Sequence, residues 1–272
     1  MRNIDFHHHL CGGGNYLAEL LAAMDACGIE RVCLSGLGIG QGRAEAAAGA
    51  FGLGSLSPGN PEVLAAFRQY PTRIIPVGAV QLGRDGAKEV YALRESGFRA
   101  LKITRPAVPY NDDLCLPVYA AAEELGLPIL FHTGMVLVTP FDAEDDVDSN
   151  RMRPMQLDRA ARRFPELRLV LAHMGMPWLE EAATMARFHP NVYIDITAAP
   201  NGWRSQLRAE EFRRLLFWEG AFSKIVFGTD VLPGLIGGAV SAHEELFDKL
   251  GLPEAVRADV LYKNALKLLG EL

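Results

Sequence analysis

Ile4-Asp5-Phe6-His7-His8-His9 is an apolar run that ends in three histidines, close to the start of the chain. In a β-strand, side chains two residues apart point to the same side, so His7 and His9 can reach one point in space while His8 faces away. Imidazole is a common ligand of zinc-like ions. A purification tag is the alternative explanation, but a tag would not be expected inside a hydrophobic run. The stretch therefore predicts a strand that supplies part of a metal site.

Three later strand-like runs also end in a side chain that can bind a metal. Residues 128–132 end in His132, residues 169–173 end in His173, and residues 225–230 end in Asp230. In a parallel barrel the carboxyl ends of the strands lie at the same mouth, where active sites are found. The sequence therefore predicts that these side chains converge with His7 and His9 on one ion.

Strand and helix patterns alternate along the chain, which is typical of parallel βα units. Strands are expected at residues 2–6, 30–35, 73–80, 99–104, 128–132, 167–173, 191–196 and 224–229. Helices are expected at residues 15–27, 61–69, 87–96, 114–125, 156–163, 178–188, 208–218 and 253–269. This pattern predicts an α/β fold, a (β/α)8 TIM barrel, that occupies residues 1–272 as a single domain.

The composition narrows the class of partner. The net charge of −6 disfavours nucleic acid, because phosphates recruit basic surfaces. No apolar run approaches the roughly 20 residues that a bilayer requires, and no signal peptide is recognisable at the N-terminus. The four cysteines show no CxxC spacing and are expected to be reduced thiols. We expect a cytoplasmic protein that acts on a small molecule, with the subunit count open and a homo-oligomer among the options.

Two long loops are expected to overhang the metal site, one at residues 36–61 and one at residues 133–153. The first contains Gly36-Leu-Gly38-Ile-Gly40-Gln-Gly42, which lacks the G-x-G-x-x-G spacing of a dinucleotide site. The second contains an acidic run from Asp142, but Val147 and Arg153 stand where a calcium loop needs Gly and Glu. Both segments are therefore interpreted as loops without a cofactor.

Several motifs resemble one enzyme superfamily. Asp5-Phe-His7-His-His9-Leu resembles the D-x-H-x-H opening of the amidohydrolases. Three further motifs resemble the amidohydrolase-related branch, namely Val170-Leu-Ala-His173-Met-Gly-Met-Pro177-Trp178, Val226-Phe-Gly-Thr-Asp230 and Tyr262-Lys-Asn264-Ala-Leu-Lys-Leu-Leu-Gly. That branch includes aminocarboxymuconate semialdehyde decarboxylase, resorcylate-type decarboxylases and a pyrone dicarboxylate lactonase. The resemblance covers nearly the whole chain, and it implies a mechanism more than a substrate.

The resemblance implies a mononuclear site, with zinc as the expected ion. His7, His9, His132 and Asp230 would be its ligands, and His173 would lie beside the metal to polarise the substrate or shuttle a proton. A catalytic zinc keeps one position open for water and lowers the pKa of that water from 15.7 to about 7. Asp230 would then take the proton of the water and hand it to the leaving group.

Lys102 leaves the number of ions open. Binuclear members of the superfamily use a carboxylated lysine from this region to bridge two metals, in which case His132 and His173 would bind the second ion. The branch usually holds one metal, so a single ion is expected. Lys102 could instead bind an acidic group of the substrate, or be an ordinary residue at the end of a strand.

Other side chains are candidates for substrate binding. Arg43 lies in the first long loop, while Arg151 and Arg153 follow the acidic run, and a guanidinium pairs well with a carboxylate. Trp178 could form a wall of the pocket or pack against the following helix. Asp195 ends a strand and could accept a hydrogen bond from a ligand histidine.

Together these features predict a metal-dependent hydrolase that attacks an ester, lactone or amide carbonyl with activated water. The alternative on the same scaffold is a non-oxidative decarboxylase, which would need arginines to hold a carboxylate. A barrel that binds a metal without catalysis is a third option, and it is disfavoured because every expected site position holds a competent residue.

Overall fold

The computed structural model describes residues 2–12, 15–36 and 59–272. Eight parallel strands form one sheet in sequence order, each paired with the next. They are β1 (Asn3–His9), β2 (Ile29–Ser35), β3 (Ile74–Val80), β4 (Ala100–Ile103), β5 (Ile129–Phe131), β6 (Leu169–Leu171), β7 (Val192–Asp195) and β8 (Ile225–Val226).

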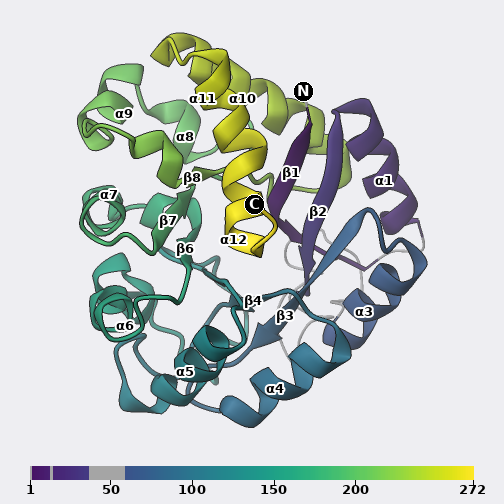
Figure 1. The fold of residues 1–272 in the computed structure, drawn as a ribbon, viewed down its shortest axis with the longest axis vertical. Helices are drawn as coiled ribbons and strands as arrows, with labels where there is room; N and C mark the ends of the chain where they lie inside the picture. The colour runs from purple at the N-terminus through teal and green to yellow at the C-terminus, as the bar shows by residue number, and fades with distance from the viewer. Residues whose placement is uncertain (1, 13–14, 37–58) are drawn as a thin grey trace.

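The sheet closes on itself between its first strand and the segment that follows β8. The backbone N–H of Phe6 donates to the Phe227 carbonyl over 2.9 Å, and the N–H of Asp230 donates to the His7 carbonyl over 2.9 Å. The strands therefore form a barrel with helices around it, as Figure 1 shows. The prediction of a (β/α)8 barrel is confirmed.

The helices lie around the barrel and across one end of it. They are α1 (Tyr16–Ala26), α3 (Asn60–Gln69), α4 (Ala87–Ser96), α5 (Leu116–Glu124), α6 (Asp158–Arg163), α7 (Leu179–Phe188), α8 (Trp203–Gln206), α9 (Ala209–Leu215), α10 (Ile236–Leu250), α11 (Glu254–Ala258) and α12 (Asn264–Leu269). In Figure 1, α12 lies over the centre of the ring of strands. Its Leu268 and Leu269 join a buried cluster with side chains of the strands, such as Ile75 and Val226. The opposite end, where the strands finish, carries the predicted metal ligands.

A register shift in β1 brings His7 to the interior side of the barrel. Ile4 and Phe6 belong to the buried cluster inside the barrel. The pairing with β2 then shifts between Asp5 and His8, and the N–H of His7 bonds the Asp5 side chain at 3.1 Å. Such a shift changes which residues of a strand face inward, and it is common beside active sites. His7 therefore follows Phe6 on the interior side.

Several boundaries differ from the sequence-based expectation. β1 extends to His9 instead of ending at residue 6, and β8 ends at Val226 instead of residue 229. The chain after β8 runs against β1, where a Cβ on Gly228 would lie 2.9 Å from that of His7. The helix expected at residues 253–269 is divided into α11 and α12 by a π-helical turn.

Helix α10 was not among the predicted helices. Two glycines in its first turn, Gly237 and Gly238, disfavour a helix by about 1 kcal/mol each relative to alanine. Burial of an apolar face that includes Ile236 and Phe247 outweighs this local preference. Within the described ranges, no helix is both long and apolar enough to cross a bilayer.

Candidate metal centre and active site

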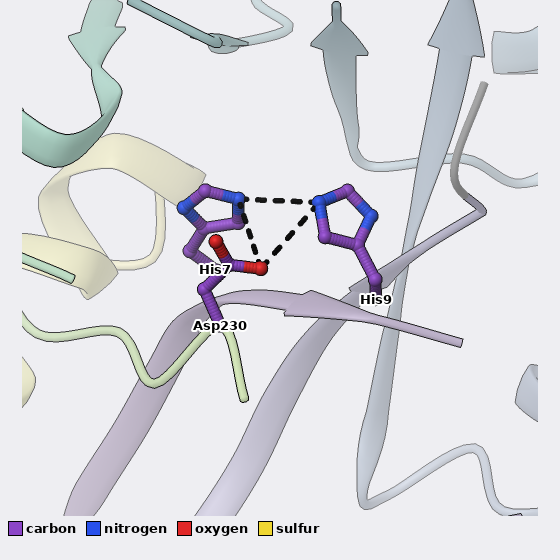
Figure 2. Close-up of side chains that lie close together, drawn as sticks. All are labelled: His7, His9 and Asp230. Atoms are coloured by element: carbon purple, nitrogen blue, oxygen red, sulfur yellow. Dashed lines mark hydrogen bonds and ion pairs between the residues drawn. The ribbon is translucent and has the colours of Figure 1, made fainter. Parts of the chain in front are cut away.

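His7, His9 and Asp230 meet at the mouth of the barrel, as Figure 2 shows. The two histidines come from β1, and Asp230 comes from the segment after β8. The Nε2 atoms of His7 and His9 lie 3.4 Å apart. Oδ1 of Asp230 lies 3.8 Å from the first Nε2 and 3.7 Å from the second. Three atoms that could bind a metal, two from β1 and one from the segment after β8, therefore surround one point.

The spacing of these atoms fits a metal ion. Two nitrogens bound at about 2.0–2.1 Å to a tetrahedral zinc are separated by roughly 3.3–3.4 Å, which matches the distance between the two Nε2 atoms. The oxygen of Asp230 lies slightly farther out, so a small movement of its side chain would bring it into contact. A set of two imidazoles and one carboxylate is also a set that zinc accepts. The residues present therefore fit such an ion.

Asp195 keeps the ring proton of His7 on Nδ1, which leaves Nε2 free to bind a metal. Oδ2 of Asp195 accepts from Nδ1 of His7 at 2.8 Å, and both side chains are fully buried. Because a neutral imidazole carries one N–H, the proton on Nδ1 leaves the lone pair of Nε2 directed at the metal site. Ligand histidines commonly have such a carboxylate partner, which also raises their basicity.

His9 and His173 are oriented in the same way. Nδ1 of His9 lies 3.1 Å from the Gly36 carbonyl, which can only accept. Nδ1 of His173 lies 2.7 Å from Oγ1 of Thr197, whose hydroxyl proton goes to Asp195 at 2.6 Å. Both imidazoles therefore carry the proton on Nδ1, and their Nε2 lone pairs face Asp230. The distance from Nε2 of His173 to Oδ2 of Asp230 is 3.6 Å.

Burial and charge hold these groups in the protonation states that bind metals. Burial lowers the pKa of His9 to about 3, and burial also lowers the pKa of His173. For Asp230, burial alone would raise the pKa, but the nearby imidazoles and Lys102 outweigh it and the pKa falls below its usual range. Neutral imidazole and ionised carboxylate are the ligand forms.

Three residues at the mouth have a left-handed backbone, which is unusual for residues other than glycine. The φ angles are 48° for Asp230, 56° for His173 and 49° for Arg105. Such a conformation costs of order 1–3 kcal/mol and is found mainly at functional sites, where the surrounding structure enforces it. The backbone N–H of Asp230 is held by the His7 carbonyl, which helps to fix this geometry.

His132 lies beside the cluster but is not one of its members. Its ring centroid lies 4.9 Å from that of His173. Its Nε2 lies 3.3 Å from the Met135 carbonyl, and it belongs to neither group of metal-binding atoms found among the described residues. The second of those groups consists of His7, His173 and Asp195. A ligand role for His132 therefore stays a prediction.

Lys102 is buried beneath the cluster. Its Nζ lies 2.9 Å from Nε2 of His7, the nitrogen that also faces Asp230. The side chain is almost fully buried, and burial lowers its pKa to about 8. Lys102 does not line the cavity described next, so its predicted contact with the substrate is not seen in this arrangement.

A cavity of about 390 Å³ opens above the cluster. It is lined by the site residues His9, His132, His173 and Asp230, by Cys11, Tyr16, Thr104 and Arg105, and by the apolar residues Val136, Leu137, Ala199, Val231, Leu232 and Leu235. Apolar walls with a few polar groups are typical of small-molecule sites. Val136 and Leu137 belong to the loop at residues 133–153, so this loop borders the site as the sequence predicted.

The predicted substrate arginines have other partners. Arg151 pairs with Asp146, and Arg153 pairs with Glu181 while its guanidinium lies 5.0 Å from the ring centroid of Trp178. None of Arg151, Arg153 and Trp178 lines the cavity. These contacts join the loop to itself and to α7. Arg43 lies outside the described residues.

Several residues of the site, among them Thr197 and Arg105, were not singled out from the sequence. Thr197 orients His173, and Arg105 lines the cavity. Each lies two residues beyond the end of a strand, β7 and β4 respectively. That position at the carboxyl end of a barrel strand is the signal that could have identified them.

Comparison with known proteins defines the family. The sequence matches the family model described as Amidohydrolase over residues 4–270, so the chain belongs to that family and is an enzyme. The family is metal-dependent. One curated relative, Protein fluG of Emericella nidulans, is 30% identical over 69 residues, which are 25% of this chain and only 7% of that protein. The resemblance inferred from the motifs is confirmed.

Solved structures share the fold at low sequence identity. An uncharacterised TIM-barrel protein from Bordetella bronchiseptica is 21% identical with a TM-score of 0.73, covering 100% of this chain and 99% of that one. A probable 2-pyrone-4,6-dicarboxylic acid hydrolase from Acinetobacter baumannii is 14% identical with a TM-score of 0.66, covering 99% and 100%. The 5-carboxyvanillate decarboxylase from Novosphingobium aromaticivorans, complexed with manganese, is 17% identical with a TM-score of 0.63, covering 98% and 96%.

Proposed function

We propose that this enzyme is a metal-dependent hydrolase that opens an ester, lactone or amide bond in a small organic molecule with activated water. The position of Asp230 carries the proposal. Its carboxylate lies within 4 Å of the Nε2 atoms of three histidines, His7, His9 and His173, and still borders the cavity with 26% of the side chain exposed. One group can therefore contact both a metal site and a substrate.

Zinc is the proposed ion, held by His7, His9 and Asp230. When bound there, it would lower the pKa of a water molecule and polarise the carbonyl of the substrate. Two imidazoles with a carboxylate suit zinc, while the manganese in the Novosphingobium structure makes manganese the first alternative to test. His132 is proposed as a further ligand, after a turn of its ring away from the Met135 carbonyl.

A single ion is proposed. The second group of metal-binding atoms shares His7 with the first, and its Asp195 is already occupied. Asp195 accepts from the His7 ring, from the N–H of His173 and from both donors of Thr197. A bridge through carboxylated Lys102 would make the site binuclear. This binuclear site stays the alternative. The number of metal ions bound per protomer distinguishes it from a site with one ion.

In the proposed reaction, Asp230 moves the proton. Its carboxylate accepts a proton from water as the water oxygen bonds to the carbonyl carbon. The same proton then passes to the leaving oxygen or nitrogen as the bond between that atom and the carbonyl carbon breaks. The lowered pKa of Asp230 keeps the carboxylate ionised, which is the form that can accept a proton.

His173 is proposed to assist as a proton carrier. With its own proton on Nδ1, its Nε2 has a lone pair 3.6 Å from Oδ2 of Asp230. In this tautomer the ring cannot donate a hydrogen bond from Nε2 to a carbonyl oxygen, so polarisation of the substrate is disfavoured. Acceptance of a proton from Asp230 is compatible with it, and the protonated ring can then donate to the leaving group.

A non-oxidative decarboxylase is the second candidate. It would place a carboxylate-bearing ring in the cavity and deliver a proton to carbon as carbon dioxide leaves. The arginines at 151 and 153 give it little support because both are paired elsewhere. The observation in its favour is Arg105, a cation in the wall of the cavity.

A direct assay separates the two candidates. Zinc-loaded and manganese-loaded protein would be incubated with a panel of esters, lactones and amides, with proton release followed in a pH-stat, and with hydroxybenzoic acids, with carbon dioxide captured. We expect proton release that requires the metal, from at least one carbonyl substrate. Carbon dioxide release without any carbonyl cleavage would show that the enzyme is a decarboxylase and not a hydrolase.

A cytoplasmic location and a homo-oligomer stay predictions.

The carboxylate behind His7 provides a prediction that does not depend on the substrate. Asp195→Asn would place an amide N–H against Nδ1 of His7 or remove part of its hydrogen bonding. We expect zinc affinity to fall by about 10–100-fold, as it does when such partners of ligand histidines are lost. Competition with a chromogenic chelator measures it.

A matched control is available in Asp158→Asn. Asp158 also bonds a histidine, His189, at 2.9 Å, but it does not line the cavity. Its substitution should leave zinc affinity unchanged. Equal zinc affinity in Asp195→Asn and the wild type would show that His7 is not a ligand.

A further inference from the structure

Arg105 is the cation in the wall of the cavity. It lies two residues beyond the end of β4, and among the described residues no other lysine or arginine lines the cavity. Its side chain is only 13% exposed. Arg105 therefore borders the cavity while most of its side chain is shielded from bulk water.

Arg105 has the same left-handed backbone conformation as the proposed catalytic residues. Its left-handed φ of 49° is shared by His173 and Asp230, which border the same cavity. The side-chain amide of Gln81 donates to the Arg105 carbonyl and holds the turn in place. A strained conformation that neighbouring groups enforce indicates a functional position.

The guanidinium of Arg105 has more N–H donors than its bonds to Asp142 and Leu137 use. One N–H bonds the carboxylate of Asp142, and another bonds the Leu137 carbonyl. A guanidinium has five N–H donors, so these two partners leave others available. Asp142 also accepts from the N–H and the hydroxyl of Thr139, so its charge is shared among several donors. Arg105 therefore keeps the capacity to bind a second anion.

We infer that Arg105 binds a carboxylate of the substrate, so that the enzyme acts on a small organic acid. This inference rests on the proposed function, because it assigns the second attachment point of the substrate in the same cavity. Six of the other thirteen wall residues are apolar, and among the described residues Arg105 is the only lysine or arginine there, so an anion in the cavity would have it as its cationic partner. The reacting carbonyl would lie at Asp230, with the carboxylate held at Arg105.

The test compares diacids with their half-amides, which have the same shape but lack one charge. Calorimetric titrations of the zinc-loaded protein would use succinate, glutarate and isophthalate beside succinamate, glutaramate and 3-carbamoylbenzoate. In the wild type we expect at least one diacid to bind about tenfold or more tightly than its half-amide, as for a hydrogen bond to a charged group. Arg105→Gln should abolish this preference.

Asp142→Asn is the matched control. It removes the same ion pair but leaves the guanidinium in place, so the preference for the diacid should persist. If both variants lose the preference equally, Arg105 only fastens the loop and the inference is wrong. It is also wrong if no diacid is preferred in the wild type, or if Arg105→Gln keeps the preference. Circular dichroism and zinc content would establish that each variant is folded.

The two proposals fail in different ways. A protein that binds zinc and prefers diacids, but cleaves no carbonyl substrate, would contradict the proposed hydrolysis alone. A protein that hydrolyses neutral esters with no preference for diacids in binding would contradict the role of Arg105 alone.

Discussion

Asp230→Asn is expected to lower kcat by about 10²–10⁴-fold, the range associated with loss of a general acid–base group. An amide cannot accept the proton of the attacking water, and it is also a weaker metal ligand than a carboxylate. The nearby imidazoles would lose their negatively charged neighbour. Initial rates would be measured at saturating zinc, with the metal content of the same sample determined by mass spectrometry.

The control for this variant is Asp113→Asn. Asp113 is 78% exposed and pairs with Arg159 at the surface, so the same chemical change should leave kcat within twofold, since exposed pairs contribute only about 0–1 kcal/mol. An Asp230→Asn enzyme that binds zinc and keeps more than about a tenth of wild-type kcat would exclude Asp230 as the proton carrier.

His9→Ala is expected to remove the metal and, with it, the activity. His9 would supply one of the three proposed ligand atoms, so its loss should weaken zinc binding by more than the roughly 10–100-fold that follows loss of a hydrogen-bond partner. The zinc content after dialysis against a weak chelator should fall from near one ion per protomer to a small fraction of that. Added zinc in large excess should restore the metal but only part of the rate.

His8→Ala is the matched control, because the adjacent histidine points away from the cluster. Its ring bonds Oγ1 of Thr229 and the hydroxyl of Tyr16, each at 2.9 Å, and it is fully buried. Its substitution should cost about 1–3 kcal/mol of folding free energy, because buried polar partners are left unpaired, while zinc stays bound. Loss of zinc from His8→Ala but not from His9→Ala would contradict the assigned ligand set.

The barrel was predictable because its strands are short and apolar. Strands buried on both faces form nearly continuous apolar runs, and segments such as β6 (Leu169–Leu171) stand out between helical stretches. The end of β8 was not predictable, because it depends on how closely the chain passes His7 at Gly228. Helix α10 was missed because the glycines in its first turn disfavour a helix, while burial of its apolar face favours one.

The convergence of His7, His9 and Asp230 could be predicted from the sequence, whereas the surroundings of His132 and Arg105 could not. His7, His9 and Asp230 lie at strand ends, and the barrel alone brings strand ends together. The ring direction of His132 depends on the Met135 carbonyl in the following loop. Arg105 forms an ion pair with Asp142, 37 residues away, and such long-range pairs leave no local pattern in the sequence.

Anomalous diffraction from zinc-soaked crystals would test most directly whether distant residues bind one ion. We expect a single strong peak within about 2.0–2.2 Å of Nε2 of His7, Nε2 of His9 and a carboxylate oxygen of Asp230. A peak bound by other residues, or no peak at the mouth of the barrel at saturating zinc, would contradict the proposed metal centre and the hydrolysis that depends on it.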